Sequence, residues 1–168
     1  MVTMITACGS GSDRVLGEGA SFHVGAGYPR NFRLPDGSSL IVFPNTSITT
    51  GKGFGKDNRN LEVDGEVIVE VSGTGAKPFV VHTRDLVIEV LEGAARFHIE
   101  ASRSKPGEET DLLEGRLRVR KSYHSDTDNE PEVLAGGEMV MINRDIDLME
   151  KEQLSPAELD KVKEKSRK

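Results

Sequence analysis

Residues 61–71 read Leu61-Glu62-Val63-Asp64-Gly65-Glu66-Val67-Ile68-Val69-Glu70-Val71. The last three valines stand at every second position, and this spacing places their side chains on one face of a β-strand. Asp64-Gly65 separates two apolar runs, and an Asp-Gly pair in such a place is typical of a tight hairpin turn. The stretch therefore predicts a β-hairpin and indicates a protein built from sheets.

Apolar runs of the same kind recur along the chain, separated by turn sequences rich in Gly, Pro and Asp. Pro35-Asp36-Gly37-Ser38 and Glu114-Gly115 each predict a hairpin between their flanking runs. No helical crossover interrupts the series, so a parallel α/β sheet is disfavoured. We expect an all-β fold, an antiparallel β-sandwich of jelly-roll-like form. The predicted strands include residues 31–34, 39–43, 66–71, 79–83, 86–91, 97–99, 110–113, 116–120 and 138–142.

The pattern changes near the C-terminus, where Ser155-Pro156-Ala157-Glu158 predicts the start of a short helix. Ser at the cap, Pro at the first helical position and Glu three residues after the cap form a capping box. We divide the chain into a flexible N-terminal segment (1–13), a β domain (14–147) and a C-terminal helical tail (148–168).

Composition excludes several classes of protein. The chain has 168 residues, one Cys and no Trp, and its 22 basic and 28 acidic residues give a net charge of −6. A single Cys rules out a disulfide scaffold and a zinc ribbon. The acidic balance argues against a nucleic-acid partner, because phosphate binding needs a basic surface. No apolar run is long enough for a transmembrane helix.

The N-terminal segment contains Ile5-Thr6-Ala7-Cys8-Gly9-Ser10, which resembles the lipobox of bacterial lipoproteins. In that interpretation Cys8 is the lipidation site and the Gly/Ser residues after it form a tether to the membrane. The residues before Cys8 carry no Lys or Arg and are few for a signal peptide. A frayed N-terminus without a role is the equal alternative.

The sequence offers no catalytic, metal or cofactor site. The histidines at 23, 82, 98 and 124 show no metal-ligand spacing, so ordinary hydrogen-bonded strand histidines are favoured. Glu66, Glu114 and Glu138 each stand beside a Gly at a predicted turn, which explains them without acid–base chemistry. There is no nucleophile elbow and no phosphate loop. We expect a protein that is not an enzyme.

One candidate partner-binding face is present. Arg116, Arg118 and Arg120 alternate with Leu117 and Val119, so the three arginines share one face of a strand. Guanidinium groups in a row can bind carboxylates of a partner protein in bidentate fashion. The commoner meaning of such alternation is a solvated strand face, and both interpretations stay open.

Five motifs in order resemble the FecR domain, the periplasmic module of iron-dicitrate-type sigma-factor regulators. The resemblance runs from about residue 22 to residue 142. One stretch departs from it: residues 87–99 lack the Gly-Thr pair of the family and carry an extra residue. The motifs are Leu34-Pro35-Asp36-Gly37-Ser38, Leu61-Glu62-Val63-Asp64-Gly65-Glu66-Val67, Lys77-Pro78-Phe79-Val80-Val81-His82-Thr83, Leu113-Glu114-Gly115-Arg116-Leu117-Arg118-Val119 and Gly136-Gly137-Glu138-Met139.

The resemblance implies a non-enzymatic signalling and interaction module in the periplasm, with a role in transmembrane signal transduction, anti-sigma-factor regulation and the regulation of iron transport. It implies a protein partner in the bacterial envelope, either a receptor or a component of the sigma regulator. The lipobox would add membrane anchoring through Cys8. The alternative is a free-standing lipoprotein with a β-sandwich that binds carbohydrate or another small ligand. The sequence supplies few aromatic residues for a carbohydrate platform, and a glycosidase is disfavoured.

Overall fold

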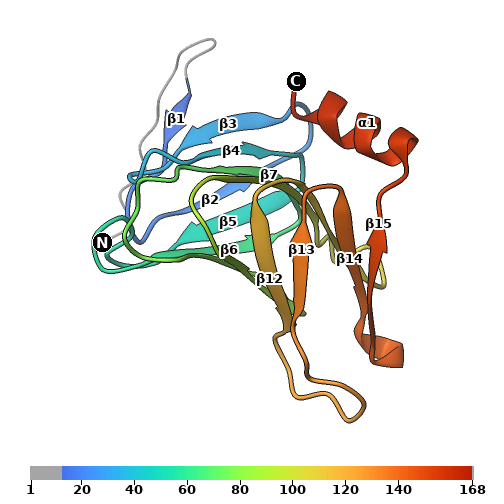
Figure 1. The fold of residues 1–168 in the computed structure, drawn as a ribbon. Coiled ribbons are helices and arrows are strands. Elements are labelled where there is room, and N and C mark those ends of the chain that lie inside the picture. The colour runs from blue at the N-terminus through green and yellow to red at the C-terminus, as the bar shows by residue number, and fades with distance from the viewer. Residues whose placement is uncertain (1–12, 168) are drawn as a thin grey trace.

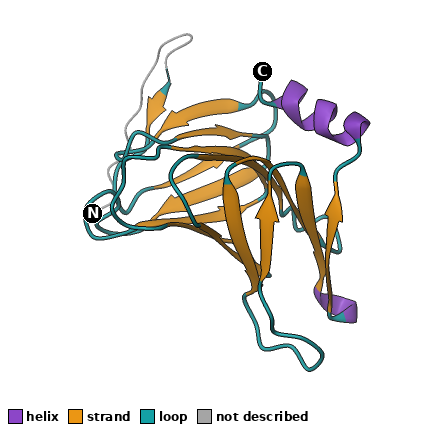
Figure 2. Cartoon of the chain, viewed as in Figure 1, coloured by secondary structure: helices purple, strands orange, loops and turns teal. Residues whose placement is uncertain are grey.

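The computed structural model describes residues 13–167, and in this part the chain forms two β-sheets packed face to face with one α-helix at the C-terminal end (Figures 1 and 2). The eight-stranded sheet has the order β1 (Arg14–Val15), β3 (Arg30–Arg33), β4 (Ser39–Val42), β7 (Glu66–Val71), β10 (Ala95–Glu100), β11 (Glu108–Glu114), β14 (Glu138–Asn143) and β15 (Leu148–Gln153). The seven-stranded sheet has the order β13 (Glu132–Ala135), β12 (Arg116–Lys121), β9 (Leu86–Val90), β8 (Phe79–His82), β6 (Arg59–Asp64), β5 (Thr46–Thr50) and β2 (Ser21–Val24). The prediction of an all-β sandwich with a short C-terminal helix is confirmed.

The core fills the space between the sheets with the inward-facing residues of both. Val67, Val69 and Val71 point into it, as their period-two spacing predicts, while Ile68 of the same strand is buried on the opposite face. Phe97 and Ile99 face inward from β10, so the intervening His98 faces outward. Burying such apolar side chains contributes about 1.5–3 kcal/mol each, which makes this shared layer the main source of stability.

The hairpin predicted at Asp64-Gly65 is wrong. β6 belongs to the seven-stranded sheet and β7 to the eight-stranded sheet, so the two strands do not pair. Only Gly65 separates them, and one residue is too short for the two-residue loop that a tight hairpin needs. Gly65 instead adopts a φ of +132° and turns the chain from one sheet into the other, the kind of corner seen where strands switch sheets.

The hairpin predicted at Glu114-Gly115 is wrong for the same reason. β11 lies in the eight-stranded sheet and β12 in the seven-stranded sheet, with Gly115 alone between them at a φ of +100°. Both corners are crowded. A Cβ on Gly65 would lie 2.8 Å from the Thr46 Cα, and one on Gly115 would lie 2.8 Å from the Ala94 carbonyl oxygen. A side chain is excluded at both positions by conformation and by space.

The true hairpins are distributed over both sheets. The turn at Pro35-Asp36-Gly37 joins β3 to β4 as predicted. β5 pairs with β6, β8 with β9, β10 with β11, β12 with β13, and β14 with β15. Each pair lies in one sheet, and after each pair from β3–β4 onward the chain crosses to the other sheet; between β5–β6 and β8–β9 it visits that sheet as the single strand β7. These repeated crossings give the jelly-roll-like course of the chain.

Two ladders are parallel, which the expectation of a purely antiparallel sandwich did not include. β1 pairs with β3 and β6 pairs with β8 in parallel register. Between β6 and β8 the chain runs through β7 in the opposite sheet, so residues 65–78 form the crossover that parallel neighbours require.

The C-terminal segment is only partly helical. Leu148–Gln153, which we placed in a helical tail, forms β15 at the edge of the eight-stranded sheet. Helix α1 (Pro156–Lys165) follows it, and the predicted capping box is present: the Ser155 side chain accepts from the Glu158 amide and the Glu158 side chain accepts from the Ser155 amide. Among the described residues no helix is long and apolar enough to cross a membrane.

Replacing Gly65 with Ala tests the corner. We expect a loss of more than about 3 kcal/mol in the free energy of unfolding, because the new Cβ combines an unfavourable φ with a clash against Thr46. Gly27→Ala is the matched control, since Gly27 has a φ of +125° and a Cβ added there would meet no atom within 4 Å. That variant should lose only about 1–2 kcal/mol. Urea unfolding of both measures the difference, and equal losses would contradict the account.

Candidate functional site

The three arginines predicted as a partner-binding face lie on the outer side of the seven-stranded sheet, on β12 between β9 and β13. Arg116 forms an ion pair of 3.2 Å with Glu92, and Arg118 one of 3.4 Å with Glu89. The two arginine side chains remain 53% and 46% exposed. Leu117 and Val119 face the core, so the predicted alternation is present.

This arginine face can exchange its partners. Exposed ion pairs contribute little stability, about 0–1 kcal/mol, so Glu89 and Glu92 are held weakly. A guanidinium group has five N–H donors, and the side-chain contacts of Arg116 and Arg118 use only one nitrogen each. Val133 lies opposite Arg118 across the ladder and is 38% exposed. The face therefore offers charge-assisted hydrogen bonds next to an apolar surface, a combination suited to protein contacts.

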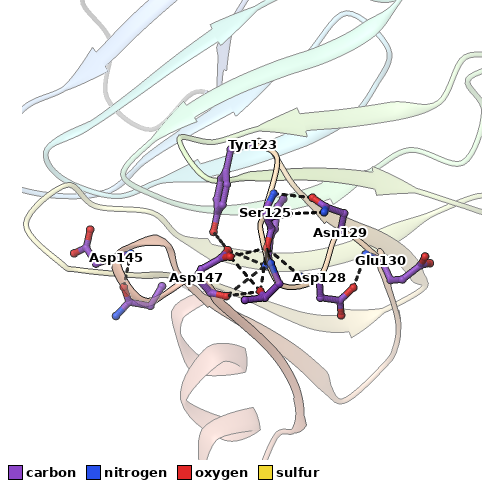
Figure 3. Close-up of polar contacts among 10 residues, drawn as sticks. Tyr123, Ser125, Asp128, Asn129, Glu130, Asp145 and Asp147 are labelled. Carbon is purple, nitrogen blue, oxygen red and sulfur yellow. Dashed lines mark hydrogen bonds and ion pairs between the residues drawn. The ribbon is translucent and has the colours of Figure 1, made fainter.

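A second feature fixes the long loop at residues 122–131, which follows the arginine face (Figure 3). Asp147 is the centre of a cluster of hydrogen bonds that holds this loop. It follows the short helix η1 (Arg144–Ile146) and has a left-handed backbone conformation. The Asp147 carboxylate accepts hydrogen bonds from Ser125 Oγ at 2.7 Å and from Thr127 Oγ1 at 3.1 Å. It also accepts from the ammonium of Lys121 at 3.0 Å. Tyr123 adds a fourth donor at 3.3 Å.

These contacts decide the charge of the cluster. The hydrogen bond from Ser125, together with that from Lys121, holds the pKa of Asp147 well below its usual range. The Lys121 side chain is only 4% exposed and occupies the place that a cation would take. Within residues 13–167, no three His, Cys, Asp or Glu side chains are arranged to hold a metal ion. The cluster is a clamp between the loop and η1.

Two surface cavities lie near these elements. One, of about 410 Å³, is lined by residues 120–124 and Asn129, where the clamped loop begins. The other, of about 350 Å³, lies between loops of both sheets and is lined mainly by basic side chains, Arg84, Arg103, Lys105 and Arg144. Buried Asp85 also lines this cavity and forms ion pairs with Arg84 and Arg144 at 3.1 and 3.5 Å. The cations of this second cavity are thus engaged with the protein's own carboxylates.

A buried charged chain was not predicted. His98 Nδ1 lies 2.8 Å from Asp111 Oδ2, and its Nε2 lies 2.8 Å from Glu66 Oε1. Lys165 of α1 reaches the same Glu66 oxygen at 2.5 Å. The period-two pattern could have shown that His98 faces away from the core, but nothing in the sequence identifies partners that far along the chain. His82 lies in the other sheet and takes no part.

The remaining candidates do not assemble. Cys8 lies outside the described residues. Glu66 on β7 pairs with Glu100 at one end of β10. Glu114 on β11 pairs with Arg96 near the other end of β10, so the two carboxylates cannot act together on one bond. Glu138 lies on β14 and forms an ion pair with Lys151. The structure therefore separates Glu66 from Glu114 and gives Glu138 a cationic partner on the neighbouring strand.

A family model described as FecR protein matches residues 20–118. The chain belongs to the FecR family. Two crystal structures described as a "putative anti-sigma factor" from Parabacteroides distasonis ATCC 8503 share the fold, with TM-scores of 0.70 and 0.71 and 23% sequence identity. The likeness covers 81% of this chain and 60% of each of those chains, so it spans less than two thirds of their length. A search of curated proteins finds no match.

The FecR motifs coincide with turns and corners of the fold. Asp36 accepts from the Ser38 amide at 2.9 Å, which closes the β3–β4 turn. Its other oxygen binds buried Arg59 at 2.7 Å, and Arg59 also donates to the carbonyl of Ser72 at 2.7 Å. Gly65 and Gly115 form the corners between the sheets. These motif residues fix turns and corners of the sandwich, whereas Arg116 and Arg118, which belong to the same motif as Gly115, stay exposed.

Asp147→Asn tests the clamp. The substitution keeps the size of the side chain and removes its charge, so Lys121 loses its counterion and the loop at 122–131 loses its anchor. We expect the amides of Thr127 and Asp128 to exchange with deuterium more than tenfold faster. Asp145→Asn, at an exposed neighbouring position, is the control and should leave their exchange unchanged. Unchanged exchange in the Asp147 variant would contradict the assignment.

Proposed function

We propose that this FecR domain is a non-enzymatic signalling module that works on the periplasmic side of a bacterial envelope, in a system that regulates a sigma factor. The match of the FecR model to residues 20–118 carries the proposal. The shared fold with the Parabacteroides proteins, described as anti-sigma factors, supports it. Control of iron transport is the process that the family suggests for the regulated genes.

The proposed partner is an envelope protein, either a receptor or a component of the sigma regulator, that binds the arginine face. The exposed guanidinium groups of Arg116 and Arg118 would exchange Glu89 and Glu92 for carboxylates of that partner. The edge strand β15 is a poorer candidate. Its exposed Lys151 reaches across to the Val133 carbonyl at 3.4 Å, and a lysine on an edge strand opposes strand addition.

Membrane anchoring through a lipid on Cys8 is part of the same proposal. The acidic net charge of −6 argues against nucleic acid as the partner. A lipid anchor would hold the domain near membrane-bound components and raise their effective concentration. If Cys8 carries the lipid, cells fed labelled palmitate should incorporate label into the native chain and none into the Cys8→Ser variant.

A transcriptional experiment tests the regulatory role. The gene is deleted in its own host and restored either as the native chain or as Arg116→Glu/Arg118→Glu. We expect deletion to change the transcripts of one sigma-factor regulon several-fold, the native chain to restore them, and the charge-reversed variant to fail, because reversal repels the partner's carboxylates.

Arg30→Glu is the matched control, since Arg30 is an exposed arginine on β3 of the other sheet. It should restore the regulon as well as the native chain does. A deletion that leaves every sigma-factor regulon unchanged would contradict the proposed function. Full restoration by the double variant would reject the arginine face alone.

A further inference from the structure

The arginine row on β12 has a regular spacing. Arg116, Arg118 and Arg120 stand at every second position of one strand, so their Cα atoms follow one another at about 6.7 Å along it. An extended peptide repeats its own side chains at the same interval, so carboxylates at every second residue match the row step for step. A helix matches it poorly, because side chains four residues apart turn by about 40° at each step and three of them do not face one strand.

Arg120 differs from the other two arginines of the row, which are paired with glutamates at 3.2 and 3.4 Å. Within residues 13–167, no carboxylate lies within ion-pair distance of Arg120. Its guanidinium donates to the Lys121 carbonyl at 3.4 Å, and its neighbour across the ladder on β9 is the apolar Val87. At Arg120 a carboxylate from outside therefore meets no internal competitor.

The cavity of about 410 Å³ continues the row, because Arg120 forms part of its lining. Two of the lining groups are already engaged: the Lys121 ammonium binds Asp147, and the Asn129 amide binds the backbone of its own loop at 2.7 Å on both sides. Arg120 and His124 are exposed and supply N–H donors to the cavity. Its volume lies at the low end of the range for ligand pockets, about 300–1,000 Å³, and suits a single side chain.

We propose that the arginine face and this cavity together bind an extended acidic segment of the partner protein, with Asp or Glu at every second residue. Two of its carboxylates replace the glutamates paired with Arg116 and Arg118, and the third enters the cavity beside Arg120. Each carboxylate gains charge-assisted hydrogen bonds from a guanidinium group. The inference rests on the proposed function, since it specifies what the partner presents to the arginine face.

An anionic membrane surface fits the same donors less well. Glu89 and Glu92 lie among the arginines, so a planar surface meets charges of both signs at once. The net charge of −6 also repels the protein from anionic lipid. A peptide is narrow enough to bring its carboxylates to the arginines alone, which favours the acidic segment as the occupant.

Titration of the full chain with synthetic peptides at low salt, followed by ¹H–¹⁵N NMR, tests the inference. The probe is a blocked peptide in which three glutamates alternate with serines, and its isomer with the three glutamates contiguous is the comparison. We expect the alternating peptide to bind at least about fivefold more tightly than the isomer, because only its spacing matches the row. The amides of β12, His124 and Asn129 should shift as it binds.

Substitutions of the competing glutamates separate ligand binding from a merely structural role of the row. Glu89→Gln and Glu92→Gln remove the internal partners of the arginines, so each should tighten peptide binding by up to about fivefold. Arg120→Gln should weaken it by more than about fivefold. Arg30→Gln is the control, because Arg30 is exposed on β3 of the other sheet, and it should leave the affinity unchanged.

No binding of either peptide, equal affinity for the two isomers, or weaker binding by Glu89→Gln would overturn the inference. Binding to phosphatidylglycerol vesicles without binding to the peptides would overturn it in favour of a membrane. The regulon experiment fails separately. Regulon transcripts that depend on the native arginines, with no peptide binding, would reject the extended acidic segment and keep the regulatory role. A deletion without effect on any regulon would reject that role itself.

Discussion

The contact between Thr46 and Gly65 fixes the passage of the chain from one sheet to the other, and much of the remaining structure depends on it. Thr46 is fully buried, and its hydroxyl accepts from the Glu66 amide at 2.9 Å and donates to the Glu66 carbonyl at 3.3 Å. This pair of hydrogen bonds leaves no room for a side chain on Gly65. Gly115, packed against Ala94 and Ala95, makes the corresponding passage further along the chain.

The two corners also determine which charged side chains point away from the core. Glu66 follows Gly65 directly and faces outward at the start of β7, where it meets His98. Arg116 follows Gly115 directly and starts the outward row of β12. Because side chains alternate along a strand, a slip of one residue at either corner would turn these groups inward and the valines outward. The arginine face and the His98–Glu66 contact thus share one structural origin with the core.

Much of the fold follows from local patterns. Alternating valines place β7, the Pro35-Asp36-Gly37 turn places the β3–β4 hairpin, and the Ser155 capping box places α1. These features involve neighbours in sequence, so a short stretch is enough to predict them.

The pairing of strands was not predictable in the same way. Asp64-Gly65 has the composition of a hairpin turn, but whether two strands pair or separate at a glycine depends on packing against Thr46 far along the chain. The ion pair of Arg59 with Asp36 and the chain from Lys165 to Asp111 likewise join distant residues. Of the candidate sites, the arginine face was predictable because it needs only alternation, whereas the His98 chain needs four elements in their final places.

The pairing of β7 tests the central claim most directly, and nuclear Overhauser contacts between backbone protons report it. The account predicts contacts of Val69 with Leu40 and with Phe97, its partners on β4 and β10. It predicts no cross-strand contacts between β6 and β7. A ladder of contacts that pairs Val63 with Val67 across Gly65 would contradict it, because the chain would then fold back at that glycine within one sheet.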